Sequence, residues 1–202
     1  ILTVLGLLLG MLLNLKLKGR IFARTIVLLP YVISSAAAGI LWKWIYDKNF
    51  GILNNYLRKI GVSSPLGWLS NPKLAIPSIV IMNSWWSVAF NTIVYLAALQ
   101  GIPEELYEAA EIDNASEWAK FRYITLPALK PIMIFVLITI TIGAFKMAVQ
   151  PMVMTGGGPS YSTYTLVYNI YQTGTVNWEI GIASAMSMIF AAFVIVLTII
   201  QN

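Results

Sequence analysis

The chain has 202 residues, of which 58% are hydrophobic and 10% are charged, and its formal net charge is +5. This composition is typical of membrane proteins, and the absence of His and Cys excludes disulfides, thiol and imidazole nucleophiles and the usual zinc sites. The Lys and Arg residues are scattered beside apolar runs, so membrane topology explains the positive charge and we expect no nucleic-acid partner.

Five apolar runs are predicted to form membrane-spanning helices, because a helix needs about 20 residues to cross a bilayer. The chain starts inside such a run, so we expect a missing N-terminal region and a truncated first span. Polar connections are expected at 47–71, with a short amphipathic helix at 52–60, and at 150–178. We therefore predict an all-α fold, a polytopic transmembrane helical bundle in which residues 1–202 form one domain. The expected spans are 1–13, 25–45, 73–99, 128–148 and 180–200.

Lys and Arg residues in short connections predict the orientation, since cytoplasmic loops carry an excess of them. Four fall within 16–24, and three more follow the third span on the same side. We expect this side to be cytoplasmic, which places 103–131 in the cytoplasm and 155–159 outside. The seven residues are Lys16, Lys18, Arg20, Arg24, Lys120, Arg122 and Lys130.

A polar and aromatic stripe is predicted in the third span. Asn83, Trp86, Ser87 and Phe90 recur at i, i+3, i+4 and i+7, so they share one helix face near the middle of the bilayer. Polar groups at that depth face protein or a water-filled path. The pattern leaves two interpretations open: contacts to a neighbouring helix, or a sugar-binding surface of aromatic rings and amides. On the second interpretation, Trp86→Ala removes a stacking surface without unpairing a backbone group.

The connection after the third span holds six of the chain's eight acidic residues. Pro103 suits the first position of a helix that ends at Asp113 and Asn114, since Asn tolerates a left-handed backbone. A second helix is expected to use Asn114 as its cap and to end before Pro127. Two short helices with small residues and a charged rim indicate a docking surface.

Two motifs carry a resemblance to a known family. The first begins with Glu108-Ala109-Ala110 and resembles the EAA loop of ABC importer permeases, which usually has Gly where this chain has Asn114. Asn can adopt the same turn, so we interpret the loop as intact. The second motif resembles the signature of maltose-type sugar permeases, and its glycines lack the Lys of a phosphate-binding loop, which favours a tight outer turn. The first motif continues through Asp113, Ala115, Phe121, Ile124, Leu126, Pro127 and Pro131. The second motif reads Met154-Thr155-Gly156-Gly157-Gly158-Pro159, followed by Thr165-Leu166.

The resemblance implies a permease subunit of a binding-protein-dependent ABC importer of the carbohydrate-uptake type. Such a subunit moves a sugar or oligosaccharide inward by alternating access across the cell membrane of a prokaryote, and 102–126 would be its cytoplasmic coupling loop. Two cytoplasmic ATPase subunits would bind ATP and Mg, so this chain is expected to hold no cofactor or metal and to catalyse no reaction. A second permease subunit from a different chain, an extracytoplasmic sugar-binding protein and membrane lipid are the other expected partners.

The resemblance also assigns roles to residues. ATPase coupling falls on Glu108, Ala109, Ala110, Asp113, Asn114 and Ala115. The substrate path falls on Asn83, Trp86, Ser87 and Phe90 of the third span and on Gly143, Ala144 and Met147 of the fourth. Ala144 and Met147 depart from the polar residues of the maltose-type pattern, which leaves the identity of the sugar open.

Other classes of function compete with this interpretation. An intramembrane protease or lipid hydrolase needs a nucleophile with a base, and the predicted spans contain no His, Cys or carboxylate. A non-transporting membrane scaffold gives no reason for a polar stripe in the third span. An ABC importer permease for a solute other than a sugar is the remaining alternative.

Overall fold

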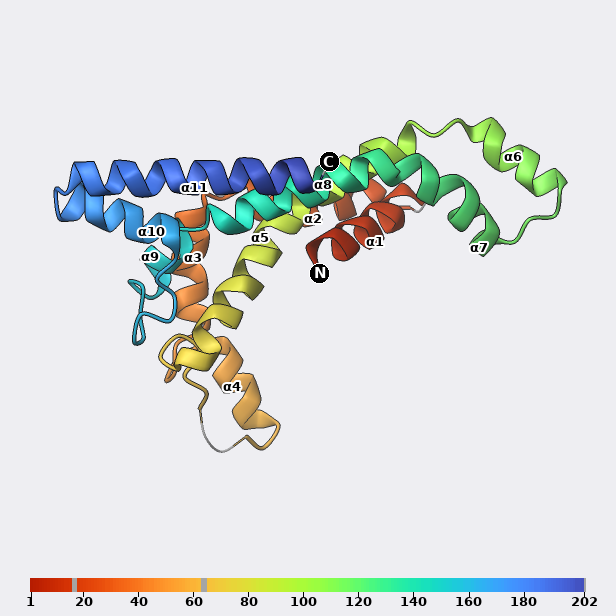
Figure 1. Cartoon of the computed structure of the whole chain (residues 1–202). Helices are drawn as coiled ribbons and strands as arrows, with labels where there is room; N and C mark the ends of the chain where they lie inside the picture. Colours follow the sequence, from red (N-terminus) through yellow and green to blue (C-terminus); the bar gives the residue numbers. More distant parts are fainter. Residues whose placement is uncertain (16–17, 63–64, 202) are drawn as a thin grey trace. The chain divides into compact units, whose positions relative to one another are not determined.

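The computed structural model describes residues 1–15, 18–62 and 65–201, and these residues form helices and connections without a strand. They divide into two compact units, the first from residues 1–30, 87–141 and 201, the second from 31–86 and 142–200. The helices are α1 (Leu2–Asn14), α2 (Arg20–Val32), α3 (Ser35–Ile45), α4 (Ile52–Lys59), α5 (Pro72–Gln100), α6 (Glu104–Ile112), α7 (Glu117–Lys120), η1 (Phe121–Thr125), α8 (Leu126–Phe145), α9 (Val149–Met154), α10 (Leu166–Tyr171), η2 (Gln172–Val176) and α11 (Ile180–Gln201) (Figure 1).

Among the described residues, three helices are long and apolar enough to cross a membrane: α5, the continuous run Glu117–Phe145, and α11. The pair of α2 and α3 adds a fourth if it is counted as one span, and α1 is a shorter apolar helix. The all-α fold is confirmed, and the expected helix at 52–60 is present as α4. Lys16, one of the residues that predict the orientation, lies outside the described residues.

The expected span at 25–45 is not one continuous helix, because the helix breaks at Ile33 and Ser34 and the two parts are bent by 97°. Pro30 lies near the end of α2 and has no N–H to donate. Ser34 then begins α3 as its N-cap, and its Oγ accepts from the Ala37 N–H at 3.3 Å. Such a cap pairs a donor that no helical carbonyl reaches, so it favours a new helix at this position.

In the first unit, α1 packs on α5 through two glycines. A Cβ on Gly6 would lie 2.9 Å from Asn91 Cβ, and a Cβ on Gly10 would lie 3.0 Å from Tyr95 Cβ. Real side chains essentially never approach as closely as the first distance and rarely as closely as the second, so the small size of both residues permits this close packing.

The second unit has a core rich in aromatic residues. Tyr46 of this core donates its hydroxyl to Ser78 O at 3.0 Å, which pairs its polar end within the packing. Helix α3 approaches α9 at Gly39, where a Cβ would lie 3.5 Å from side-chain atoms of Val153 and Met154. The buried members of the core are Ala38, Tyr46, Ile79, Met82 and Met154, and Trp42, Trp68, Trp85, Trp86 and Met147 are among the partly buried residues that pack against them.

The α4 segment, residues 47–62 and 65–68, is organised around one fully buried amide. Asn54 Nδ2 donates to the carbonyls of Asp47, Lys48 and Leu66 at 3.3, 3.2 and 2.9 Å. Its Oδ1 accepts from the Leu66 N–H at 3.1 Å and from Trp68 Nε1 at 3.2 Å. One side chain therefore fixes the course of the backbone before and after α4.

Candidate functional site

The acidic connection, called here the α6–α7 loop (residues 102–126), folds as two helices joined by a tight turn (Figure 1). Asn114 has a φ of 55°, the left-handed backbone that the sequence predicts. Its N–H donates to Glu111 O at 3.0 Å, and the Ala115 N–H donates to Ala110 O at 2.9 Å. This is a Schellman motif, which pairs the last carbonyls of a helix, and Ala110 and Ala115 occupy its two positions that commonly touch.

The rest of the α6 surface is uncovered. No residue of α6 is buried, and Glu108, Ala109 and Asp113 are exposed. Ile112 is 81% exposed, and Trp118 on α7 is 70% exposed. Apolar side chains that stay exposed beside carboxylates are typical of a surface that another protein covers.

Polar contacts hold α6 against the helix that follows it. Tyr107 Oη and Thr125 Oγ1 lie 2.8 Å apart. Lys120 is 8% exposed, and its Nζ donates to Glu111 Oε1 and Glu117 Oε1 at 2.9 Å each. The hydrogen bond from Lys120, and then its charge, hold the pKa of Glu111 below its usual value, and the same contacts raise the pKa of Lys120. The loop is therefore braced internally while most residues of α6 remain exposed.

Two details of the predicted loop are wrong. Helix α7 is capped by Ser116, whose Oγ accepts from the Ala119 N–H at 3.2 Å, because Asn114 is already used in the turn that ends α6. The helix also does not end before Pro127, but continues through the π-helix η1 into α8. The wider turn of a π-helix leaves room for the proline ring, so the helix continues past Pro127.

On α5, two residues of the predicted stripe have partners within the second unit. Asn83 Oδ1 accepts from Gln150 Nε2 of α9 at 3.1 Å. Trp86 Nε1 donates to Ile33 O, at the break between α2 and α3, at 2.7 Å. Contacts of this kind are what the helix-contact interpretation of the stripe expects. Sequence reasoning did not select Gln150, although a single Gln among apolar residues of 148–154 was a signal.

The partner of Trp86 corrects one expectation. The indole has a single N–H, so its donor is occupied by Ile33 O, and the ring lies 5.1 Å from that of Tyr31. Trp86→Ala would leave that carbonyl without this partner, contrary to the expectation that no backbone group is unpaired. Trp86 therefore has a structural contact whether or not it also meets a solute.

The remaining residues of the predicted path lie in different surroundings. Gly143 and Ala144 are exposed on α8, and a Cβ on Gly143 would meet nothing within 4 Å. Met147 is half-buried and packs against the same core as Trp86. On the part of α5 that belongs to the first unit, Ser87 is half-buried and Phe90 is exposed.

Comparison with known proteins identifies the family. The family of binding-protein-dependent transport system inner membrane components matches residues 3–202. The chain belongs to this family. It is therefore a multi-pass permease component of the inner membrane, as the EAA-type loop and the hydropathy predicted.

Two curated relatives illustrate the range of this permease family. The trehalose/maltose transport system permease protein MalF of Thermococcus litoralis is 41% identical over 98% of this chain and 66% of that protein. The sn-glycerol-3-phosphate transport system permease protein UgpA of Brucella abortus is 37% identical over 92% of this chain and 63% of that protein. The chain thus spans about two thirds of the length of these relatives.

Two solved structures have the same permease fold. A bacterial ABC transporter involved in the import of the acidic polysaccharide alginate matches with a TM-score of 0.85 and 28% identity, over 98% of this chain and 70% of that one. The alginate ABC transporter in complex with an alginate pentasaccharide-bound periplasmic protein matches with a TM-score of 0.89 and 27% identity, over 99% and 70%.

The glycine-rich motif of this permease forms the tight turn that the sequence predicts. Gly156 and Gly157 have φ of 61° and 86°, and a Cβ on Gly157 would lie 2.5 Å from the Tyr164 ring. Thr165 caps α10, and its Oγ1 donates to Met147 O at 2.6 Å. The motif therefore fixes the backbone where α8 ends, beside a residue of the predicted path.

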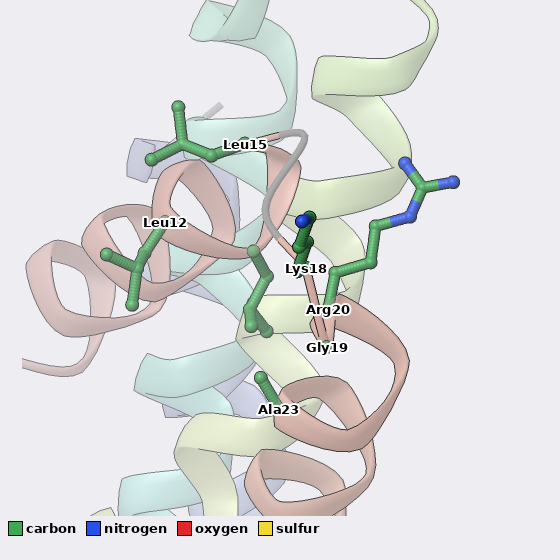
Figure 2. A pocket seen from close by; sticks show the side chains of 7 residues that line it. Leu12, Leu15, Lys18, Gly19, Arg20 and Ala23 are labelled. Atoms are coloured by element: carbon green, nitrogen blue, oxygen red, sulfur yellow. The ribbon is translucent and has the colours of Figure 1, made fainter.

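A small open pocket of about 90 Å³ lies between the end of α1 and the start of α2. Figure 2 shows Leu12, Leu15 and Ala23 on its wall, while the guanidinium of Arg20 points away from both leucines. None of the predicted path residues lines it. Among the described residues, no group of three or more acidic, His or Cys side chains could hold a metal ion.

Proposed function

We propose that this chain is the permease subunit of an ABC importer that carries a sugar or oligosaccharide into the cytoplasm by alternating access. The observation that carries the proposal is the uncovered helix α6 in a member of a transport family. Helix α6 has no buried residue and is braced by Lys120 and Tyr107, yet it exposes Ile112 and the coupling positions Glu108 and Ala109. This arrangement suits a rigid coupling helix that a partner subunit binds and displaces when it moves.

The proposed partners follow from the role of α6 as a coupling helix. Two cytoplasmic ATPase subunits hold the α6–α7 loop, and their closure on ATP tilts the membrane helices. A second permease subunit from a different chain completes the path, and an extracytoplasmic binding protein delivers the solute. ATP hydrolysis and solute binding are then coupled through the equilibrium between inward-facing and outward-facing states.

The substrate class rests on the relatives and on the stripe. MalF of Thermococcus litoralis, named for trehalose and maltose, supports a sugar. Asn83 and Trp86 of α5 supply an amide and an aromatic ring, which suit the hydroxyls and the C–H faces of a sugar. A solute other than a sugar is the second candidate, and the relative named for sn-glycerol 3-phosphate is the observation that favours it.

Glu108→Lys tests the coupling role. Glu108 is exposed, so the folded chain should tolerate the change. The substitution reverses the charge at this position and should therefore disrupt a contact that Glu108 makes with the ATPase. We expect the complex to form through Ile112 and the alanines, with uptake and sugar-stimulated ATP hydrolysis lost. The measurement is uptake and ATPase activity of the complete transporter in proteoliposomes.

Glu179→Lys is the matched control, because Glu179 is also exposed but lies outside the α6–α7 loop, directly before α11. It should keep coupled activity. Normal sugar-stimulated ATPase activity and uptake in Glu108→Lys would contradict the docking role, and equal loss in both variants would assign the effect to charge reversal alone.

A further inference from the structure

The predicted path lacks a polar side chain on one side, and the structure supplies a candidate. Ala144 and Met147 cannot form side-chain hydrogen bonds, although polar residues were expected there. Gln150 follows Met147 by three residues, is 8% exposed, and donates to Asn83 Oδ1 at 3.1 Å. Two amides from α5 and α9 therefore meet within the second unit, in a region where apolar side chains dominate.

The charge of this region is equally informative. The seven predicted path residues and Gln150 include no ionisable side chain. Lys146, next to Met147 in sequence, is exposed on the chain following the last turn of α8. An anionic solute that bound among these residues would lose its hydration shell, and none of their side chains carries a positive charge to compensate for that loss. Removing water from an unpaired charge is unfavourable in a region of low dielectric.

We propose that Gln150 is a residue of the substrate path, and that the Asn83–Gln150 amide pair selects uncharged, hydroxyl-bearing solutes over anionic ones. This inference rests on the proposed function as a sugar permease, and it adds a residue and a charge preference that neither the motif nor the relatives assign.

The amide pair suits a hydroxyl because a hydroxyl both donates and accepts. A sugar hydroxyl inserted between the two side chains donates to Asn83 Oδ1 and accepts from Gln150 Nε2, so both groups keep a partner while the direct hydrogen bond opens. The ionised oxygen of a carboxylate or phosphate offers no donor, so in the same position it leaves Asn83 Oδ1 facing an anion. The selection is therefore made by the donor and acceptor pattern as well as by the missing cation.

The test uses the complete transporter in nanodiscs without a binding protein, so that the permease alone discriminates. Binding of trehalose, maltose, maltotriose and sn-glycerol 3-phosphate is measured by ligand-observed NMR for the wild type, Gln150→Ala and Gln150→Lys. We expect at least one uncharged sugar to bind, and sn-glycerol 3-phosphate to bind at least about tenfold more weakly. Gln150→Ala should weaken the sugar about tenfold, as for one lost hydrogen bond to a ligand. Gln150→Lys keeps a donor for Asn83 and should shift the preference toward sn-glycerol 3-phosphate.

Gln172→Ala is the control, because its Nε2 also bonds a side chain of the same unit, Tyr168 Oη, at 2.9 Å. It should leave the preference unchanged. A fall in melting temperature and yield with unaltered sugar affinity in Gln150→Ala would overturn the inference and make Gln150 a packing residue. A Gln150→Lys transporter with the wild-type preference would overturn the charge selection. A wild-type transporter that binds none of the uncharged sugars would overturn the proposed sugar substrate, and this inference with it.

Discussion

Two connections between membrane helices are built in opposite ways. The α4 segment encloses Asn54, whose five hydrogen bonds are all made within the segment. The α6–α7 loop has no such centre: α6 buries no residue, and its order depends on the Asn114 turn and on contacts of Lys120 and Tyr107. The first connection has a buried centre of its own and also packs on the core of the second unit through Trp68, while the second keeps a defined shape with α6 left exposed.

The largest effect is expected from Asn54→Ala, which removes the centre of the α4 segment. The change leaves several partly buried backbone groups and the Trp68 indole without this partner. An unsatisfied buried group costs about 1–3 kcal/mol, so we expect a total above about 3 kcal/mol from the five lost hydrogen bonds. The measurement is the melting temperature of the purified transporter, together with protease cleavage between 47 and 68. Asn55→Ala is the control, because the neighbouring amide is exposed and should cost less than about 1 kcal/mol. Similar stability in the two variants would refute the contrast.

A smaller effect is expected from Asn114→Val in the α6–α7 loop. A β-branched residue at a φ of 55° costs about 1–2 kcal/mol, whereas Gly adopts this backbone freely. Because α6 has no buried core to transmit the strain, faster hydrogen exchange should be confined to amides of α6 and its turn, with the α4 segment unchanged. Asn114→Gly should exchange as the wild type does. Faster exchange throughout the chain would show that the loop is not an independent unit.

The smallest effect is expected from pH. The depressed pKa of Glu111 means that its ion pair stabilises the loop above the ordinary Glu value of 4.5 and is lost as the pH falls through the depressed value. The raised pKa of Lys120 means that its contribution persists below the ordinary Lys value of 10.5 and is lost only above it. Protection of the α6 amides, corrected for intrinsic exchange, should therefore be constant between these values and fall in acid.

Glu111→Gln separates this effect from other acid-sensitive groups. Backbone hydrogen bonds from Phe50 and then Asn49 also lower the pKa of Asp47 in the α4 segment, so acid acts on both connections. The variant should remove acid dependence from the α6–α7 loop and leave it in the α4 segment. An undiminished acid dependence of the loop in Glu111→Gln would exclude the Lys120 pair as its cause.

Local patterns predicted the elements whose causes are local. Helices α5 and α11 follow from continuous hydropathy, α4 from a short amphipathic period, and the left-handed Asn114 from the tolerance of Asn for that backbone. Ser116 was missed as the cap because Ser116 and Asn114 both suit that role, and only the geometry of the turn assigns each to one helix. The passage through Pro127 was missed because a π-helical turn has no clear signature in composition.

Contacts between residues far apart in the sequence could not be predicted from local sequence patterns. Gln150 and Asn83 are 67 residues apart, so only folding shows that the two amides meet. The break at Ile33 was equally hidden, because 25–45 is mostly apolar and its bend depends on the Ser34 cap and on a partner in α5. Of the predicted path, Asn83, Trp86 and Met147 acquired specific neighbours, whereas the sequence offered no means of separating solute contacts from helix contacts.

The hydrogen bond between Trp86 and Ile33 also implies an order of events during synthesis. The ribosome releases Ile33 long before Trp86, which lies 53 residues later, so the carbonyl at the break first enters the membrane without that partner. An unpaired carbonyl in hydrocarbon is costly, which favours a straight helix over 25–45 at that moment. The contact therefore favours an order in which the 97° bend forms in a second stage, when helices already inserted come together and α5 brings the indole to Ile33 O.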